Sequence, residues 1–253
     1  MVKLSVIVIA KNEALNIQRC LASVDFADEV IVLDSGSTDN TVELARAMSA
    51  QVHLADWQGY GVQKQRALSH ATSEWVLNLD ADEYVDQHLK QVILKSIQQS
   101  DNDGYRIPIQ LCFYNKQLRF SSRPKRHIRL FKRNKAKYSS DIVHEKVILD
   151  EGSKISQIKT PILHTSFQDL SHAIYKMNLY SSYSAKTCLK KKRKPTLLWT
   201  ICRASWLFLR CYIIQGGFLD GRAGFLCAAL HANGSFFRGI KQLYPDQGWT
   251  IIP

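Results

Sequence analysis

The sequence predicts an α/β fold: a mostly parallel sheet with helices on both faces, followed by a helical C-terminal region. Three observations predict it. Short β-branched, apolar runs alternate with helical stretches through the first part of the chain. Several of these runs end in acidic or turn-forming residues, and after Pro161 the strand-like pattern gives way to helical stretches. Strands that alternate with helices form a parallel sheet covered on both faces.

The expected elements follow in order along the chain. The runs LSVIVIA and EVIVL are almost wholly apolar, which is typical of strands buried on both faces. The expected strands span 4–10, 29–33, 51–54 and 74–79, and the expected helices span 13–24, 41–49 and 61–71. From about 104 to 150 the pattern is strand-like and strongly basic.

Charge and cysteine content narrow the class of protein. The 253 residues carry a formal net charge of +12, which favours anionic partners such as nucleic acid, anionic lipid or phosphorylated substrates. Charged residues make up 22% of the chain, which argues against wholesale disorder. The six cysteines form no CxxC pair and no Cys/His group with zinc spacing, so we expect reduced thiols in the cytosol. The run at 4–10 leads directly into KNE, as a first strand does and a signal peptide does not.

Acidic residues follow two of the expected strands. Asp80 and Asp82 have the i, i+2 spacing that points both side chains to one side. Two such carboxylates suit Mg²⁺ or Mn²⁺, which in turn binds substrate phosphates. Asp34 ends the strand at 29–33, and ligands bind at the carboxyl ends of parallel strands. We therefore expect the three carboxylates to meet around one cation-bound diphosphate. The alternatives are a solvated acidic turn at 80–82 and a helix-capping turn at Asp34.

The first part of the chain resembles glycosyltransferase family 2. The resemblance rests on three strings taken together: SVIVIAKNEALNIQRCLASV at 5–24, EVIVLDSGSTDNT at 29–41 and EWVLNLDADE at 74–83. It implies a GT-A fold, a nucleotide-sugar donor such as a UDP-sugar, a divalent metal and inversion at the anomeric carbon.

The resemblance also implies roles for individual residues. Asp34 would contact the uracil or ribose, and Glu13 would lie near the nucleoside. Asp80 would face the ribose or sugar, and Asp82 would hold the metal. Lys64 stands where the family often has arginine, so it would reach a phosphate as a point charge without a bidentate fork.

The rest of the chain resembles the lipopolysaccharide core β-1,4-glucosyltransferases of the WaaE type. The matching strings lie at 129–147, 163–185 and 216–228. This resemblance implies a hexosyltransferase that moves glucose from UDP-glucose to a lipid-linked acceptor, the lipopolysaccharide inner core. His164 matches a position of this subgroup, but the sequence assigns it no role.

An inverting transfer needs a general base outside the nucleotide-binding strands. Glu145 is the first candidate and Asp141 the second, while adjacent His144 could complete the metal shell. Arg126 and Arg129, three residues apart, carry guanidinium forks that suit diphosphate oxygens. The alternatives are a surface glutamate, a structural histidine and a general basic face.

A membrane contact is expected near the C-terminus. The segment 196–214 is nearly all apolar but contains Arg203 and Arg210, seven residues apart and therefore on one face. Because buried arginines are costly in lipid, a helix lying in the interface fits better than a spanning one. The basic run 190–194 would meet anionic headgroups. The alternative is an ordinary buried helix. We expect a cytoplasmic protein, peripheral on the cytoplasmic face of the inner membrane.

The expected domains are a catalytic domain at 1–165 and a helical region at 166–253. Within the first, 1–100 would bind the nucleotide-sugar and 101–165 the acceptor. Two other functions compete. A metal-dependent nucleotidyltransferase usually has a Gly-rich phosphate loop after its first strand, where this chain reads AKNEALN. A nucleic-acid-binding protein is suggested only by the charge, and no zinc, helix-turn-helix or aromatic RNA-binding motif is present. We therefore expect no nucleic-acid partner.

Overall fold

The computed structural model describes residues 2–98, 101–113, 116–122, 124–139, 146–167, 169–190 and 195–245. The chain divides into two compact units. Unit 1 comprises Met1–Ile109 and Pro124–His164, and unit 2 comprises Gln110–Arg123 and Thr165–Pro253. The division lies next to the boundary expected at 165, except that the segment 110–123 belongs to unit 2. The acceptor role assigned to 101–165 stays a prediction.

The N-terminal part of unit 1 alternates strands and helices as expected. In chain order the elements are β1 (Leu4–Ala10), α1 (Ile17–Ala22), β2 (Glu29–Asp34), α2 (Thr41–Ala47), β3 (Gln51–Leu54), α3 (Tyr60–His70), β4 (Trp75–Asp80), β5 (Glu83–Tyr84) and α4 (Gln87–Gln98). The strands β3, β2, β1 and β4 lie in that order and pair in parallel. Parallel order places the carboxyl ends of β1, β2 and β4 at one edge of the sheet.

The sheet becomes antiparallel beyond β4. The remaining elements that complete or flank it are β6 (Gly104–Phe113), β8 (Lys125–Lys132), η1 (Arg133–Lys135), β9 (Ala136–Tyr138), β10 (Val147–Leu149), β11 (Ile155–Gln157) and β12 (Ile162–His164). β8 pairs antiparallel with both β4 and β6, and β12 pairs antiparallel with β5. The predicted α/β fold with helices is confirmed, and the sheet is mixed because the basic segment supplies antiparallel strands.

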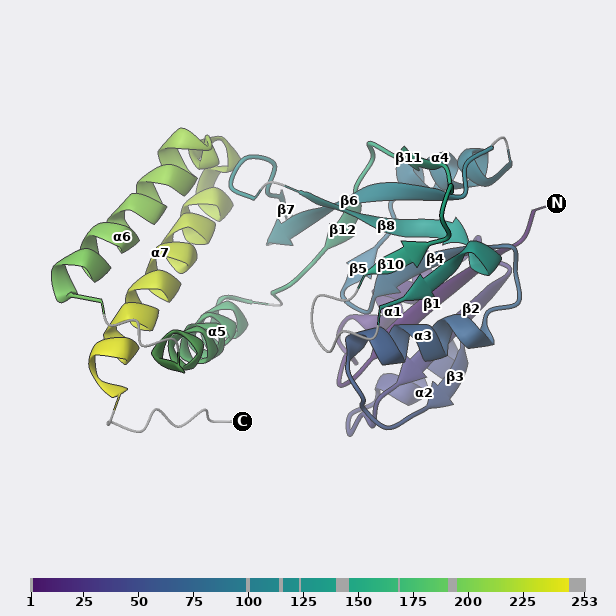
Figure 1. Ribbon diagram of the computed structural model, residues 1–253, viewed down its shortest axis with the longest axis horizontal. Coiled ribbons are helices and arrows are strands. Elements are labelled where there is room, and N and C mark those ends of the chain that lie inside the picture. Colours follow the sequence, from purple (N-terminus) through teal and green to yellow (C-terminus); the bar gives the residue numbers. More distant parts are fainter. Residues whose placement is uncertain are drawn as a thin grey trace. The chain divides into compact units, whose positions relative to one another are not determined.

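Two apolar cores cover the two faces of the parallel half. On one face, alternate β1 residues such as Val6 and Val8 pack with Ile17 and Leu21 of α1 and with Ile93 of α4. The other face of β1 and β2 packs against the apolar side of α3, which lies in front of these strands in Figure 1. Strands buried on both faces carry apolar residues at nearly every position, which is why the sequence shows continuous apolar runs here.

Unit 2 is mainly helical. Its elements are β7 (Lys116–Gln117), α5 (Leu170–Lys190), α6 (Leu197–Leu209), the π-helical turn η2 (Arg210–Ile214), η3 (Gly217–Asp220) and α7 (Gly221–Leu243). Helices α6 and α7 run side by side in Figure 1, and α5 packs against α7. The turn into α7 is tight, since a Cβ atom on Gly224 would lie 1.9 Å from the carbonyl oxygen of Gly217.

A buried carboxylate fixes the start of α7. Asp220 accepts hydrogen bonds of 2.8–3.1 Å from the backbone N–H groups of Arg119, Phe120 and Ser121. It also accepts one of 2.8 Å from the Ser121 hydroxyl. Four donors satisfy this buried acid without a cation, which ties the loop after β7 to the helices.

The net charge is confined to one unit. Unit 1 contains 19 Lys and Arg residues and 19 Asp and Glu residues, so its formal charge is zero. Unit 2 contains 15 Lys and Arg residues against 3 Asp and Glu residues, a formal charge of +12. The excess charge of the chain therefore belongs to the helical unit and not to the sheet.

Candidate active site

A charged network lies where β4 ends. One carboxylate oxygen of Asp80 is 2.9 Å from Lys64 Nζ on α3, and the other is 2.9 Å from Arg129 Nη2 on β8. Lys64 and Arg129 are almost fully buried. Burial opposes the ionisation of Asp80, but the Arg129 and Lys64 charges outweigh it and hold the pKa of this carboxyl well below its usual range. Asp80 is therefore an anion fixed in place by two cations.

Glu83 extends this network into the interior. Its Oε1 atom is 2.8 Å from Arg129 Nη2, and its Oε2 atom accepts a 2.9 Å hydrogen bond from the Asp80 backbone N–H. Burial raises the pKa of Glu83 to about 7. The charge of Arg129 acts in the opposite direction, and the charge of Asp80 raises the pKa further. Glu83 was not expected as a site residue from the sequence; the available signal was a further acid after Asp82 in DADE.

A β-bulge directs Arg129 toward Asp80. In the β6–β8 ladder Tyr105 pairs with Leu130 and Arg106 pairs with Ile128, so Arg129 is the extra residue. In a regular strand neighbouring side chains point to opposite faces. Here Ile128 and Arg129 line the same cleft. A bulge re-aims a side chain in this way, commonly beside a functional site.

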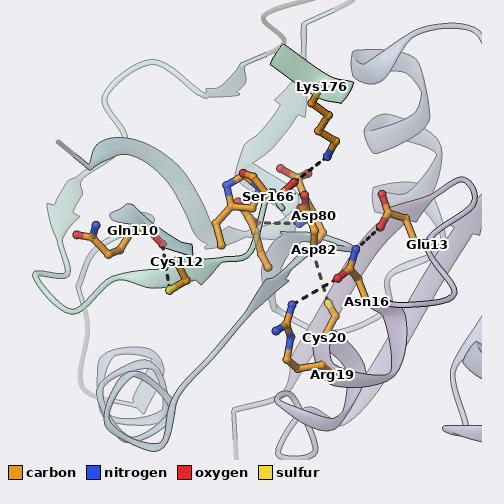
Figure 2. A network of polar contacts seen from close by, with 12 residues as sticks. Glu13, Asn16, Arg19, Cys20, Asp80, Asp82, Gln110, Cys112, Ser166 and Lys176 are labelled. Carbon is orange, nitrogen blue, oxygen red and sulfur yellow. Dashed lines mark hydrogen bonds and ion pairs between the residues drawn. The ribbon is translucent and has the colours of Figure 1, made fainter. Parts of the chain in front are cut away.

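Asp82 and His164 form a second pair at the same strand end. His164 closes β12, where it pairs with Glu83 of β5. Its Nε2 atom lies 2.9 Å from Asp82 Oδ2. Burial alone would lower the pKa of His164, but the hydrogen bond and charge of Asp82 outweigh it and raise that pKa. Figure 2 shows Asp80 and Asp82 next to each other, with the Cys20 thiol directed at the Asp80 carbonyl.

The pair formed by Asp82 and His164 has the chemistry of a divalent-cation site. A carboxylate oxygen and an imidazole nitrogen are both common metal ligands, and carboxylates suit Mg²⁺ and Mn²⁺. Two protein ligands leave coordination positions for waters and phosphate oxygens. Both oxygens of Asp80 are taken up by Lys64 and Arg129, so Asp80 is placed to position a ligand by hydrogen bonding. The residues present therefore fit the divalent cation expected from the sequence.

These groups line a cleft of 920 Å³ in unit 1. Most of its charged residues are basic, and the full set is Lys64, Arg106, Arg126, Arg129 and Lys146 together with Asp80 and Glu83. An excess of cations in a concave site raises the local concentration of anionic ligands. Within the part of the chain that is described, the Nε and Nη1 atoms of Arg129 are buried without a hydrogen-bond acceptor. They are donors that a phosphate oxygen could satisfy.

Asp34 lies apart from this cleft. Its Oδ1 atom accepts hydrogen bonds of 2.9 Å from the backbone N–H groups of Gly36 and Ser37, and the Ser37 hydroxyl donates to Oδ2. The residue lines a separate hollow of 540 Å³. Strand β1 separates β2 from β4, so the ends of these strands are about 10 Å apart at two strand spacings. Asp34 and the pair at 80 and 82 share a sheet edge, but they do not surround one point.

The other expected site residues have different positions. Arg126 lines the 920 Å³ cleft and is exposed. Glu13 lies in the loop after β1, where its carboxylate accepts a 2.8 Å hydrogen bond from Asn16 (Figure 2). Asp141, His144 and Glu145 lie outside the described residues.

Unit 2 contains a group of soft ligand atoms. Cys211, Cys227 and His231 each offer one ligand atom within 4.8 Å of the others. Burial raises the pKa of the Cys227 thiol to about 12 and also raises that of Cys211, whose thiol is 3.4 Å from the Ser121 carbonyl. Both thiols are therefore protonated and packed, whereas metal binding needs thiolates. This group was not expected from the sequence, although Cys227 and His231 lie four residues apart on α7; Cys211 joins them from the preceding turn η2.

Comparison with known proteins identifies the class. The description "Glycosyl transferase family 2" matches residues 5–151, more than half of the chain. The chain belongs to glycosyltransferase family 2. A Rickettsia bellii protein described as an uncharacterized glycosyltransferase is 32% identical over 94% of this chain and 85% of its own length. The lipopolysaccharide core biosynthesis glycosyltransferase LpsC of Rhizobium meliloti is 29% identical over 94% of this chain and 91% of its own length.

Solved structures also resemble this member of family 2. Glucosyl-3-phosphoglycerate synthase from Mycobacterium tuberculosis, in complex with Mn²⁺, UDP and glucosyl-3-phosphoglycerate, has 27% identity and a TM-score of 0.36, and the match covers 44% of each chain. S. aureus TarS 1–349 has 15% identity and a TM-score of 0.48, covering 98% of this chain and 93% of that chain. Membership of family 2 establishes the expected glycosyltransferase activity, and the α/β sheet with its helices agrees with the expected GT-A class.

Replacement of Arg129 tests the charge network. We expect Arg129→Met to lower the free energy of unfolding by about 3 kcal/mol or more, because it leaves buried carboxylates without their cation. Arg126→Met, on the same strand and lining the same cleft, should change it by no more than about 0.5 kcal/mol. Urea denaturation of both variants measures this. Equal effects from the two substitutions would show that the network does not hold β4, β5 and β8 together.

Proposed function

We propose that this glycosyltransferase moves a hexose, glucose from UDP-glucose, onto a hydroxyl of a lipid-linked acceptor, the lipopolysaccharide inner core. The observation that carries the donor part is the basic cleft around Asp80 and the adjoining pair of Asp82 and His164. The acceptor part is supported by the name of the LpsC relative, which is similar over nearly the whole chain. The choice of glucose rests on the resemblance of the sequence strings.

The two hollows at the sheet edge suit two parts of one nucleotide. The 920 Å³ cleft has the cations for a diphosphate. Arg129 offers its unused Nε and Nη1 atoms there, and Arg126 adds a second guanidinium at the exposed wall. The hollow beside Asp34 contains several carboxylates and one arginine, so it suits an uncharged base or ribose and not a phosphate. A nucleoside diphosphate laid across the end of β1 would occupy both.

Asp82 and His164 would hold Mg²⁺ or Mn²⁺. A bound divalent cation would neutralise the charge that develops on the departing diphosphate. His144 is the histidine chosen from the sequence, and this proposal replaces it by His164 because the His164 imidazole lies 2.9 Å from the Asp82 carboxylate. Asp80, fixed between Lys64 and Arg129, would accept a hydrogen bond from a ribose or sugar hydroxyl.

Glu145 is proposed as the general base, with Asp141 as the second candidate. The acceptor hydroxyl oxygen would bond to the anomeric carbon as the bond from that carbon to the diphosphate breaks. The carboxylate of Glu145 would take the hydroxyl proton, and UDP would leave as the anion. The next residue in the chain, Lys146, lines the 920 Å³ cleft.

A panel of nucleotide sugars tests the donor assignment. We expect UDP-glucose with Mn²⁺ to raise the melting temperature of the protein more than GDP-mannose, CMP-sialic acid or UDP-galactose does. Turnover with purified core oligosaccharide should release UDP and not pyrophosphate. The Glu145→Ala variant should keep the thermal shift and lose turnover by about a hundredfold or more, the scale of general-base catalysis. Near-normal turnover in Glu145→Ala would remove Glu145 as the base, and release of pyrophosphate would overturn glycosyl transfer.

Metal titration separates the two histidines. The His164→Ala variant should bind Mn²⁺ at least tenfold more weakly than the parent, since one direct ligand is lost. His144→Ala serves as the matched control and should leave the Mn²⁺ affinity within about twofold. Calorimetry in the presence of UDP gives both affinities. If His144→Ala weakened Mn²⁺ binding more than His164→Ala did, His144 and not His164 would be the metal ligand.

We also propose that unit 2 binds the cytoplasmic face of the membrane. By length and composition, Leu197–Ile214 is apolar enough to cross a bilayer, and only 11% of it is buried. Its exposed residues include Leu198 and Trp206, at 71% and 54% exposed. Arg203 and Arg210 interrupt it, and the unit carries the whole net charge of +12. An apolar face with flanking cations is typical of a helix lying in the interface.

Vesicle flotation tests this contact. The protein should float with vesicles that contain phosphatidylglycerol and much less with pure phosphatidylcholine. Leu198→Glu combined with Trp206→Glu should weaken binding at least tenfold, because each exposed side chain contributes about 1.5–3 kcal/mol when buried in lipid. Leu15→Glu, at an exposed leucine of unit 1, is the matched control. Unchanged flotation of the double variant would show that α6 does not face the bilayer.

A further inference from the structure

Two hollows in unit 2 share a pair of arginines. One hollow, of 530 Å³, lies between the end of α5 and the facing sides of α6 and α7, and the other, of 410 Å³, lies among the same three helices. Arg203 of α6 and Arg238 of α7 line both. Among the residues that the structure describes, these two alone line both hollows, so the two guanidinium groups lie where the hollows adjoin.

Close packing of α6 against α7 brings the arginines together. A Cβ atom on Gly239 would lie 2.3 Å from Thr200 Cγ2, so the Thr200 side chain of α6 packs directly against the α7 backbone here. Arg203 follows Thr200 by three residues and therefore lies on the same side of α6. Arg238 immediately precedes Gly239. Burial, and then the charge of Arg203, lowers the pKa of Arg238, which agrees with two like charges facing one space.

No carboxylate neutralises this pair among the described residues. Arg203 lies over the Trp199 ring at 5.1 Å, and no ion pair joins either guanidinium to a described acid. The described acids of unit 2 are used elsewhere. Asp220 binds the backbone at 119–121, and Asp169 accepts a 2.7 Å hydrogen bond from the His172 backbone N–H. Arg203 is exposed and Arg238 is half-buried, and an anionic ligand would relieve the repulsion between their like charges.

A third polar group lies in the 410 Å³ hollow. Ser235 is 9% exposed, and its hydroxyl is buried without a hydrogen-bond partner. It precedes Arg238 by three residues, so both side chains lie on one face of α7. A buried hydroxyl without a hydrogen-bond partner is unfavourable, and a ligand oxygen would satisfy it. Two guanidinium forks and a hydroxyl donor are together the donor set that binds phosphate oxygens.

The remainder of the 410 Å³ hollow is largely apolar. Its walls include Phe167, Met177, Leu207 and Leu230. A free inorganic anion would gain nothing from these side chains, whereas a ligand with a phosphate at one end and a hydrocarbon chain at the other would contact both parts. The exposed apolar residues of α6 lie on the helix that carries Arg203. This continuity favours a ligand drawn from a lipid layer.

We propose that Arg203, Arg238 and Ser235 form a binding site for the phosphate group of a phospholipid or other phosphorylated lipid, whose hydrocarbon chain lies along the apolar wall of the hollow. The site is separate from the cleft at Asp80 and does not depend on which sugar is transferred. It gives unit 2 a specific lipid contact in addition to the general attraction of its charge.

Binding to the full-length protein tests the site. The probes are dihexanoyl phosphatidic acid below its micelle concentration, dihexanoyl phosphatidylcholine and inorganic phosphate. We expect phosphatidic acid to bind most tightly. Arg203→Gln and Arg238→Gln should each weaken it about tenfold or more, the loss of one charge-assisted contact, and Ser235→Ala should weaken it by a smaller factor. Arg210→Gln and Arg222→Gln, at exposed arginines in the same unit, are matched controls and should stay within about twofold.

The outcomes discriminate between sources of the phosphate. Equal affinity for inorganic phosphate and phosphatidic acid would overturn the lipid assignment. If the Arg210 and Arg222 substitutions weakened phosphatidic acid binding as much as the Arg203 and Arg238 substitutions did, binding would reflect the general positive charge of unit 2. That result would overturn the site. Absence of binding would overturn it as well. Circular dichroism confirms that each variant is folded. Because the measurement needs no transfer, an Asp82→Ala variant that has lost turnover should still bind phosphatidic acid, which separates failure of this proposal from failure of the proposed function.

Discussion

The contact of Arg129 with Asp80 and Glu83 is the constraint on which the site depends. One guanidinium nitrogen serves two carboxylates from the β4–β5 turn, and Lys64 completes the neutralisation of Asp80 from α3. Buried ion pairs add little net stability, because desolvation offsets the attraction between the charges. Their effect here is positional. The contacts join the end of β4, the bulge of β8 and one face of α3, and the pair of Asp82 and His164 lies beside them at the same strand end.

The sequence predicted correctly the features that depend on a local pattern of residues. Apolar runs such as 4–10 and 29–33 are read from composition alone, and the structure has strands there. The acidic ends of β2 and β4 follow from strand order in a parallel sheet. The sequence was insufficient where distant segments meet. The partnership of His164 with Asp82 depends on β12 pairing with β5, and neither strand is longer than three residues. The bulge at Arg129 depends on the register between β6 and β8, which no local pattern records.

Lys64 and Arg129 illustrate how basic residues are misread from sequence. Both were expected to bind phosphate, Lys64 from the resemblance to the family and Arg129 because a guanidinium fork suits diphosphate oxygens. In the structure they are committed first to Asp80, which needs two cations at a partly buried position. Arg129 keeps two nitrogens for another acceptor, so it can hold Asp80 and also bind a phosphate. The sequence does not reveal that its first partner is Asp80. The net charge of the whole chain also did not show which region is basic. When the charge is counted for each unit, all of the excess positive charge belongs to the helical unit 2.

The division of charge also affects how the molecule responds to an external field. Unit 1 has no formal net charge, so a negatively charged surface exerts little net force on it, whereas the same surface pulls strongly on unit 2. This attraction would orient the molecule before it touches the surface. It acts over about 8 Å, the Debye length at physiological ionic strength. Substitutions in the sheet that change which sugar is bound can leave this orienting force unchanged, because the force originates in unit 2.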